Sequence, residues 1–132
     1  MTVRRGDVYW VDFDPVKGSE QAGLRPAVIV QNDTGNRHSP TTIVAAISRS
    51  VPSRRYPFIV QLERGEAGLA FASVVNCSQL VTIQQSGTSS RLRPPPGQHE
   101  VVPIGQLEPE RLAELDQALA YSLGVFSRHG SR

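Results

Sequence analysis

Short apolar runs separated by turn residues fill most of the chain before residue 84 and restrict it to a mainly β fold. Runs of about four to eight residues rich in Val, Ile and Thr, bounded by Gly, Pro, Asn or Ser, are typical of strands. We expect strands in DVYWVDF (7–13), PAVIVQN (26–32), TTIVAAIS (41–48), PFIVQLE (57–63) and AFASVVNCSQLVTI (70–83). The last is one long strand or two short ones, and in the first Val8 and Trp10, or their neighbours, should face the core.

Two segments between these runs have the composition of loops. DTGNRHSP (33–40) consists largely of turn-forming residues. QQSGTSSRLRPPPGQHE (84–100) is rich in Ser, Gly and Pro, and its consecutive prolines cannot lie inside a sheet. We therefore expect a proline-rich surface loop at about residues 86–98, followed by a short strand in VVPIGQL (101–107).

The C-terminal part of the chain carries a complete set of helix signals. In EPERLAELDQALAYSLG, Pro109 suits the first turn, acidic residues favour the positive end of the helix dipole, and Gly124 can end the helix. We expect a helix at about residues 109–123. An apolar stripe for core or dimer packing is formed by Leu112, Leu115, Leu119 and Leu123.

Length and composition indicate one domain, residues 1–132, with a single core. The one cysteine, Cys77, excludes an internal disulfide and is expected to be a small core residue. None of His38, His99 and His129 has a partner at a metal-ligand spacing, so no metal or other cofactor is expected. No signal peptide and no membrane-spanning run are evident, which favours a cytoplasmic protein.

Basic residues outnumber acidic ones, and the excess lies before the helix. The net charge is +2. Residues 1–107 hold eleven Lys and Arg against eight Asp and Glu, whereas the remainder holds three against four. The part of the molecule before the helix is therefore the favoured place for an anionic ligand.

The connection DPVKGSEQAGLRP (14–26) is longer than an ordinary turn, and it places Glu20 and Arg25 among glycines before an apolar run. Together with the flanking RGDVYWVDF and AVIVQND, and with SPTTIVAAIS (39–48), it resembles the MazF/PemK family of bacterial toxin endoribonucleases. The similarity is clear over about residues 4–50 and faint beyond.

This resemblance implies an SH3-like barrel of antiparallel strands with a C-terminal helix, the MazF/CcdB-type toxin fold, assembled as a homodimer. It also implies a metal-independent endoribonuclease of the bacterial cytoplasm that cuts single-stranded RNA, usually mRNA, at short defined sequences. A cognate MazE-like antitoxin with an acidic segment would block the RNA site. The RNA 2′-OH would attack the adjacent phosphate, leaving a 2′,3′-cyclic phosphate and a 5′-OH.

The family match points to Arg25 and Ser48 as catalytic residues. Arg25 can give bidentate hydrogen bonds to phosphoryl oxygens and stays charged at any working pH. Ser48 occupies a position where many relatives carry Thr; it keeps the hydroxyl but loses a methyl group that restricts the rotamer. Glu20 is a third candidate, as a proton acceptor, as a residue that orients Arg25, or as an RNA contact.

Recognition of unstacked bases needs polar side chains and stacking surfaces. The candidate RNA-binding residues are Lys17, Ser19, Gln21, Arg49, Arg54, Arg55, Tyr56 and Gln79. Tyr56 is expected either to stack on a base or to pack on the barrel. Arg91 and Arg93 either extend the RNA track or have no role in it.

Two other functions fit the same fold. One is a non-enzymatic toxin that poisons DNA gyrase, which would not need Arg25 or Ser48. The other is an RNA-binding module that has lost cleavage, with Ser48 as the lesion. Substitution of Arg25 separates the first of these from a ribonuclease.

Overall fold

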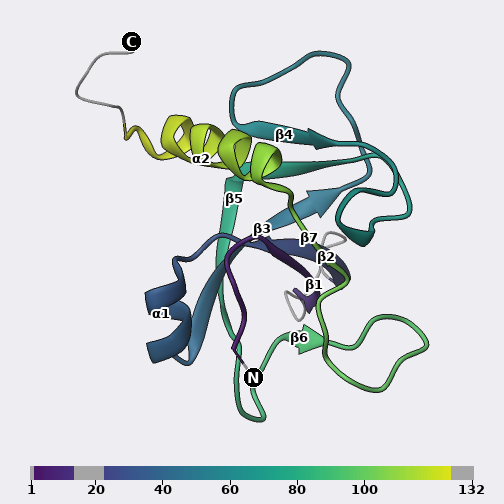
Figure 1. Cartoon of the computed structure of the whole chain (residues 1–132), viewed down its shortest axis with the longest axis vertical. Helices are drawn as coiled ribbons and strands as arrows, with labels where there is room; N and C mark the ends of the chain where they lie inside the picture. The colour runs from purple at the N-terminus through teal and green to yellow at the C-terminus, as the bar shows by residue number, and fades with distance from the viewer. Residues whose placement is uncertain (1, 14–22, 126–132) are drawn as a thin grey trace.

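The computed structural model describes residues 2–13 and 23–125, and its strands form one seven-stranded sheet. Neighbouring strands are antiparallel and follow the spatial order β4-β5-β3-β2-β1-β6, while β7 also pairs with β1 (Figure 1). The elements are β1 (Asp7–Asp12), β2 (Leu24–Ile29), α1 (Asp33–His38), β3 (Thr41–Ser48), β4 (Ile59–Leu62), η1 (Glu66–Gly68), β5 (Ser73–Gln84), β6 (Leu92–Arg93), β7 (Gly105–Gln106) and α2 (Pro109–Leu123).

The sheet curves because its longest strand pairs with two others around an irregularity. β5 has 12 residues and pairs with both β3 and β4. The β3–β5 register shifts between Ala45 and Ile47, and such a bulge bends a strand and increases its twist. The result is a half-barrel of antiparallel strands, with α2 lying over β4 and β5 (Figure 1). The predicted mainly β fold with a C-terminal helix is confirmed.

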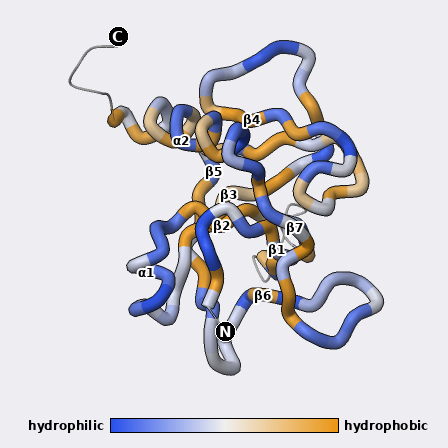
Figure 2. The backbone as a smooth tube through the Cα atoms, in the orientation of Figure 1, coloured by the Kyte–Doolittle hydropathy of each residue, from blue (hydrophilic) through white to orange (hydrophobic). Residues whose placement is uncertain are grey.

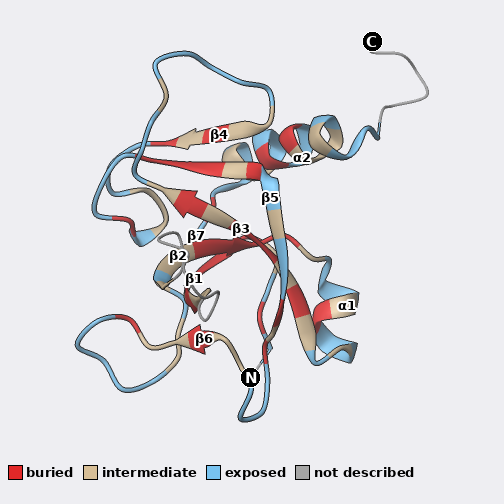
Figure 3. Cartoon of the chain, turned by 180° about the vertical axis from the view of Figure 1, so that it is seen from behind, coloured by how far each residue is buried: buried red, intermediate tan, exposed pale blue. Residues whose placement is uncertain are grey.

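Apolar residues cover both faces of the sheet around β1 and β2. Successive residues of a strand point to opposite faces. Val8 accordingly joins the core beneath α2, whereas Tyr9 and Val11 join a second cluster on the other face, and all three are almost fully buried. Figure 3 shows most of β1 and the second half of β2 in red, as buried. Burial of Val8 fits the expectation for this strand, but Trp10 is only half-buried.

The segment predicted as a loop at residues 33–40 contains a short helix, α1, so that prediction is wrong. Asn32 caps the helix by accepting a hydrogen bond from the Gly35 N–H at 2.8 Å. Asn36 is buried, and its side-chain oxygen accepts from the Thr42 hydroxyl at 2.7 Å and from the Gln31 amide at 3.0 Å. These side-chain contacts stabilise the helix, and composition alone does not reveal them.

The proline-rich segment is also more ordered than its composition predicts. Within residues 84–100, β6 pairs with β1, and Leu92 is only 2% exposed. The strand ends at Arg93, directly before the prolines, as the missing proline N–H requires. Pro95 is buried, whereas residues 96–100 are exposed, as predicted for a surface loop.

The predicted C-terminal helix is confirmed at Pro109–Leu123, and Gly124 ends it in the left-handed conformation, with φ 74°. Leu115 is fully buried in the core, and Leu112 and Leu119 pack against that core. Leu123 is 62% exposed, so the stripe leaves the core in the last turn. In Figure 2 the strands are mostly coloured as hydrophobic, whereas the connections between them are mostly hydrophilic. Among the described residues, no helix is long and apolar enough to cross a membrane.

Cys77 provides a test of the core. It is 0% exposed within the cluster beneath α2, and burial raises the pKa of its thiol to about 11. The thiolate is the reactive form. At pH 8 we expect the native protein to react with a thiol-specific disulfide reagent at least about 100-fold more slowly than the urea-unfolded chain. Equal rates, followed by absorbance, would contradict this packing.

Candidate active site

Arg25 lies in β2 opposite Val11 of β1, and Pro26 lies opposite Trp10. The extended strand fits the preference of a residue that precedes proline. The Arg25 side chain is half-buried. No residue within 2–13 and 23–125 forms a hydrogen bond or ion pair with this side chain, so its N–H donors are not occupied by any of them.

Ser48 is the last residue of β3, the strand that pairs with β2. The antiparallel pairing of β2 with β3 includes Ala27 opposite Ala46. The pairing ends there, but its register, extended by two residues, would bring Arg25 opposite Ser48. Both residues line the same two cavities, which agrees with this placement. The Ser48 Oγ accepts a hydrogen bond from the Ser50 N–H at 3.0 Å. This contact fixes the oxygen and leaves the hydroxyl proton to be donated.

Two cavities adjoin at this pair. The larger has a volume of about 600 Å³ and the smaller about 250 Å³. Arg25, Ser48 and Ser50 line both. No Asp or Glu is among the described residues that line either cavity. The site therefore combines a guanidinium, two hydroxyls and apolar walls, an arrangement that suits an anion attached to flat apolar groups.

Three of the predicted RNA-binding residues line the two cavities at Arg25. Tyr56 and Gln79 line the smaller cavity with Arg25. Arg49 lines the larger one, with its guanidinium 4.2 Å from the centre of the Phe71 ring.

Arg54 and Arg55 lie in the connection between β3 and β4, whose outer end is hydrophilic (Figure 2). Arg54 is exposed and stands over Tyr56, 5.7 Å from its ring centre. Arg55 lines a separate hollow with Arg111, so the structure does not place it with Arg25. Lys17, Ser19, Glu20 and Gln21 lie outside the described residues.

Several side chains at the site were not among the predicted site residues. Trp10, Phe71, Pro95 and Ile104 line the larger cavity, and Asn76 lines the smaller. They come from distant parts of the sequence, and each reads locally as an ordinary strand or loop residue. The only local signal was Trp10, an aromatic residue in the strand that precedes the long connection.

Arg93, considered above as an extension of the RNA track, donates to Asp12 at 3.1 Å, so its charge is largely compensated.

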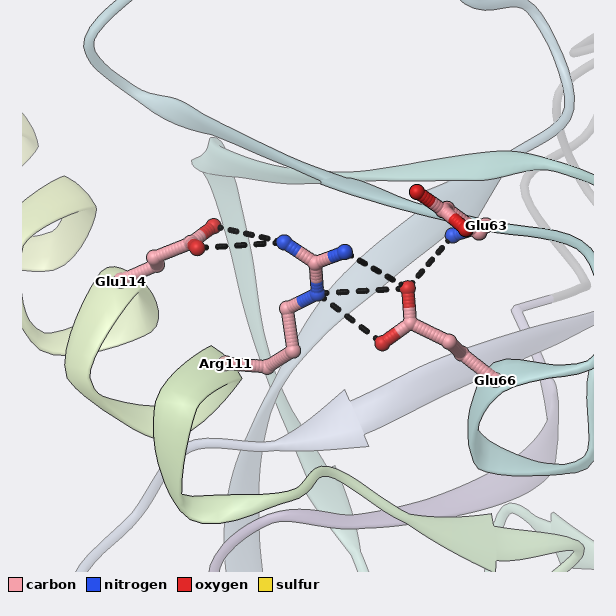
Figure 4. A network of polar contacts seen from close by, with 4 residues as sticks. All are labelled: Glu63, Glu66, Arg111 and Glu114. Atoms are coloured by element: carbon pink, nitrogen blue, oxygen red, sulfur yellow. Dashed lines mark hydrogen bonds and ion pairs between the residues drawn. The ribbon is translucent and has the colours of Figure 1, made fainter.

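A charged network joins α2 to η1 and to Glu63 (Figure 4). Arg111 donates to Glu66 at 2.8 and 2.9 Å and forms an ion pair with Glu114 at 3.1 Å. Glu66 also accepts from the Glu63 N–H at 2.6 Å. Glu66 begins η1, and the residues that follow, from Gly68 to Phe71, line the cavity. The hydrogen bonds from Arg111, followed by that from the Glu63 N–H, hold the pKa of Glu66 below its usual value.

This network predicts a pH dependence of stability. Because the pKa of Glu66 is lower in the folded state, its contribution is present above the unfolded-state pKa and is lost as pH falls through the folded-state pKa. We expect Glu66→Gln to be less stable than the wild type by about 1 kcal/mol at pH 7, and the difference should shrink towards pH 3. Thermal unfolding at several pH values measures it, with the exposed Glu100→Gln as control; a difference independent of pH would contradict the role of ionised Glu66.

The fold and the site together define a small β half-barrel with a cationic cleft, and the described residues that line this cleft include no carboxylate. Residues 4–123 match the family described as PemK-like, MazF-like toxin of type II toxin-antitoxin system. Endoribonuclease MazF of Staphylococcus epidermidis is 40% identical over 131 residues, which cover 98% of this chain and 99% of that protein. The chain therefore belongs to the PemK/MazF family of toxins, and the predicted family and endoribonuclease class are confirmed.

Solved structures agree on the fold. An endoribonuclease in complex with its cognate antitoxin from Mycobacterial species matches with a TM-score of 0.67 and 22% identity, over 95% of this chain and 98% of that one. A MazE-MazF structure from Deinococcus radiodurans matches with a TM-score of 0.70 and 20% identity, over 96% of this chain and 100% of that one.

Proposed function

We propose that this toxin cuts single-stranded RNA, mRNA in particular, at a short sequence and without a metal ion, by attack of the 2′-OH on the adjacent phosphate. The observation that carries the proposal is that Arg25 and Ser48 both line two adjoining cavities, whose described lining contains no acidic residue. A phosphate placed there would meet a charged donor fork and a hydroxyl donor, with apolar walls for the flanking bases.

The chemistry needs charge stabilisation and two proton transfers. As the 2′-oxygen bonds to phosphorus and the 5′-oxygen leaves, negative charge builds on the non-bridging oxygens. Arg25 would donate to these oxygens, and the Ser48 hydroxyl would donate to one of them or to the leaving oxygen. Donors preorganised in this way are worth about 3–4 kcal/mol each. Glu20 remains the candidate that would accept the proton of the 2′-OH, and water can supply the proton that converts the leaving oxygen to a 5′-OH.

We also propose a MazE-like antitoxin, a homodimer and a bacterial cytoplasmic location. Support for the antitoxin comes from solved relatives whose structures are described as complexes with an antitoxin. An acidic partner segment would complement Arg25 and Arg49 in a cleft whose described lining holds no carboxylate.

The test is incubation of the purified protein with a long single-stranded RNA in excess EDTA, with every new end mapped and its chemistry identified. Cuts at one recurring sequence, with 2′,3′-cyclic phosphate and 5′-OH ends, are expected. Cleavage that requires added Mg²⁺, or ends with a 5′-phosphate, would overturn the proposed mechanism. RNA binding without any cut would indicate a module that has lost cleavage.

Ser48 should contribute through its hydroxyl alone. Ser48→Ala is expected to lower kcat about 10²-fold, whereas Ser48→Thr, which keeps the hydroxyl, should stay within about three-fold of the wild type. Single-turnover cleavage of one mapped site measures both. Equal activity of the alanine variant would remove Ser48 from the mechanism.

A further inference from the structure

The strand that borders β1 is interrupted by an insertion beside the site. In β6, Leu92 pairs with Val11 and Arg93 with Trp10; in β7, Gly105 pairs with Val8 and Gln106 with Asp7. An uninterrupted strand would place residue 95 opposite Val8. Gly105 stands there instead, ten residues later. Residues 94–104 therefore form a loop that leaves the sheet edge next to Trp10 and returns to it, as Figure 1 shows between β6 and β7.

This insertion forms part of the larger cavity. Pro95 near its beginning and Ile104 at its end both line that cavity, and Pro95 is buried. The loop has its own internal support, since the Gln98 N–H donates to the Pro95 carbonyl at 2.9 Å and Val101 packs against the second core cluster. The walls of the cavity thus depend on residues that an uninterrupted edge strand would lack.

The end of the insertion is locked to the opposite wall. A Cβ added at Gly105 would lie 2.2 Å from the Ala67 carbonyl carbon, and one added at Gly68 would lie 1.9 Å from the Ile104 oxygen. The two backbones can approach this closely only because both positions are glycine. Glu66, held by Arg111, begins the same turn (Figure 4). The insertion, η1 and α2 are therefore joined by direct contacts.

The lining of this cavity suits a nucleobase. Trp10, Phe71 and Pro95 offer flat apolar surfaces, and Phe71 is 53% exposed with the Arg49 guanidinium over its ring. Bases of single-stranded RNA stack on aromatic side chains and on arginine planes. Because Arg25 and Ser48 line the same cavity, a base held there would be next to the phosphate they contact.

We propose that residues 94–104 are a specificity element: with Trp10 and Phe71 they enclose one base next to the bond that is cut, and they decide which base is accepted there. This inference rests on the function proposed above. It assigns a role to the insertion, which is not needed for the phosphate chemistry of Arg25 and Ser48.

Deletion of residues 95–104 is the direct test, because it joins Pro94 to Gly105 and keeps both pairings of β1 in register. Cleavage is mapped on an RNA library randomised around one wild-type cut site. The deletion variant, shown to be folded by its thermal unfolding, is expected to lose selectivity at one position beside the cut by roughly ten-fold, while selectivity elsewhere is kept. Unchanged selectivity in a folded, active variant would overturn the inference and leave the proposed function standing.

A point variant guards against failure of the deletion to fold. Pro95→Ala combined with Ile104→Ala should lower selectivity at the same position, whereas the exposed neighbour Pro96→Ala should behave as the wild type. Equal effects of the double variant and of Pro96→Ala would show that the change acts through the loop in general, and would overturn the role of its cavity-lining residues.

The fluorescence of Trp10, the sole tryptophan in the sequence, gives a readout that needs no cleavage. Four 2′-O-methyl RNA hexamers, each of a single base, cannot react and serve as probes. We expect one or two of them to change the emission of the wild type at low concentration, and the deletion to remove this preference. If the wild type cuts no RNA yet shows this base preference, the proposed function is wrong, while the proposed base pocket is supported. No change with any hexamer would overturn the pocket.

Discussion

Arg25→Ala is expected to lower kcat for RNA cleavage about 10³-fold, the largest effect of any single substitution at the site. The half-buried guanidinium has no hydrogen-bond or ion-pair partner among the described residues, so its removal breaks no polar contact with them and should change Tm by less than about 2 °C. Single-turnover cleavage at one mapped RNA site, together with thermal unfolding, measures the two quantities separately.

Two matched variants identify what Arg25 supplies. Arg25→Lys keeps the charge but not the planar fork, and it should recover only part of the activity. Arg37→Ala removes the same charge from the exposed last turn of α1 and should leave cleavage within about three-fold of the wild type. If Arg37→Ala impaired cleavage as severely as Arg25→Ala, net charge would be the cause. Full activity of Arg25→Ala would contradict the proposed mechanism.

The strands of the half-barrel could be predicted because each one is a local apolar run. β3 matches the predicted residues 41–48, and α2 matches the predicted helix, because their signals lie within the elements themselves. α1 could not be predicted in this way. Its buried Asn36 depends on partners in β3 and in the segment before the helix, and the Gln85 amide also donates to the Asn36 carbonyl at 3.0 Å.

The candidate site was predictable only in part, for a similar reason. Arg25 and Ser48 could be selected because they stand in a recognisable pattern at the ends of two strands that pair with each other. Trp10, Phe71 and Ile104 reach the same cavity through the pairing of β1 with β7 and the approach of Gly68 to Gly105. Neither contact has a local sequence pattern, so sheet closure decides which apolar residues become walls of the site.

Leu115→Ala should cause the largest loss of stability that we predict, about 3 kcal/mol, which lowers Tm by roughly 10 °C. Leu115 is fully buried where α2 packs on the sheet, and its truncation leaves a cavity among close-packed neighbours. The residues that line the cleft remain, so RNA cleavage below the new Tm should persist. Urea unfolding with the wild type alongside measures the loss.

The same substitution at the other end of the stripe provides the control. Leu123 lies in the same helix but is 62% exposed, so Leu123→Ala should change stability by less than about 0.5 kcal/mol. A loss at Leu123 equal to that at Leu115 would mean that the end of α2 is covered in solution, and its dependence on protein concentration would show whether a second copy covers it. A small loss at Leu115 would contradict the packing of α2 itself, because a side chain that excludes water this completely cannot be shortened without cost unless its surroundings collapse.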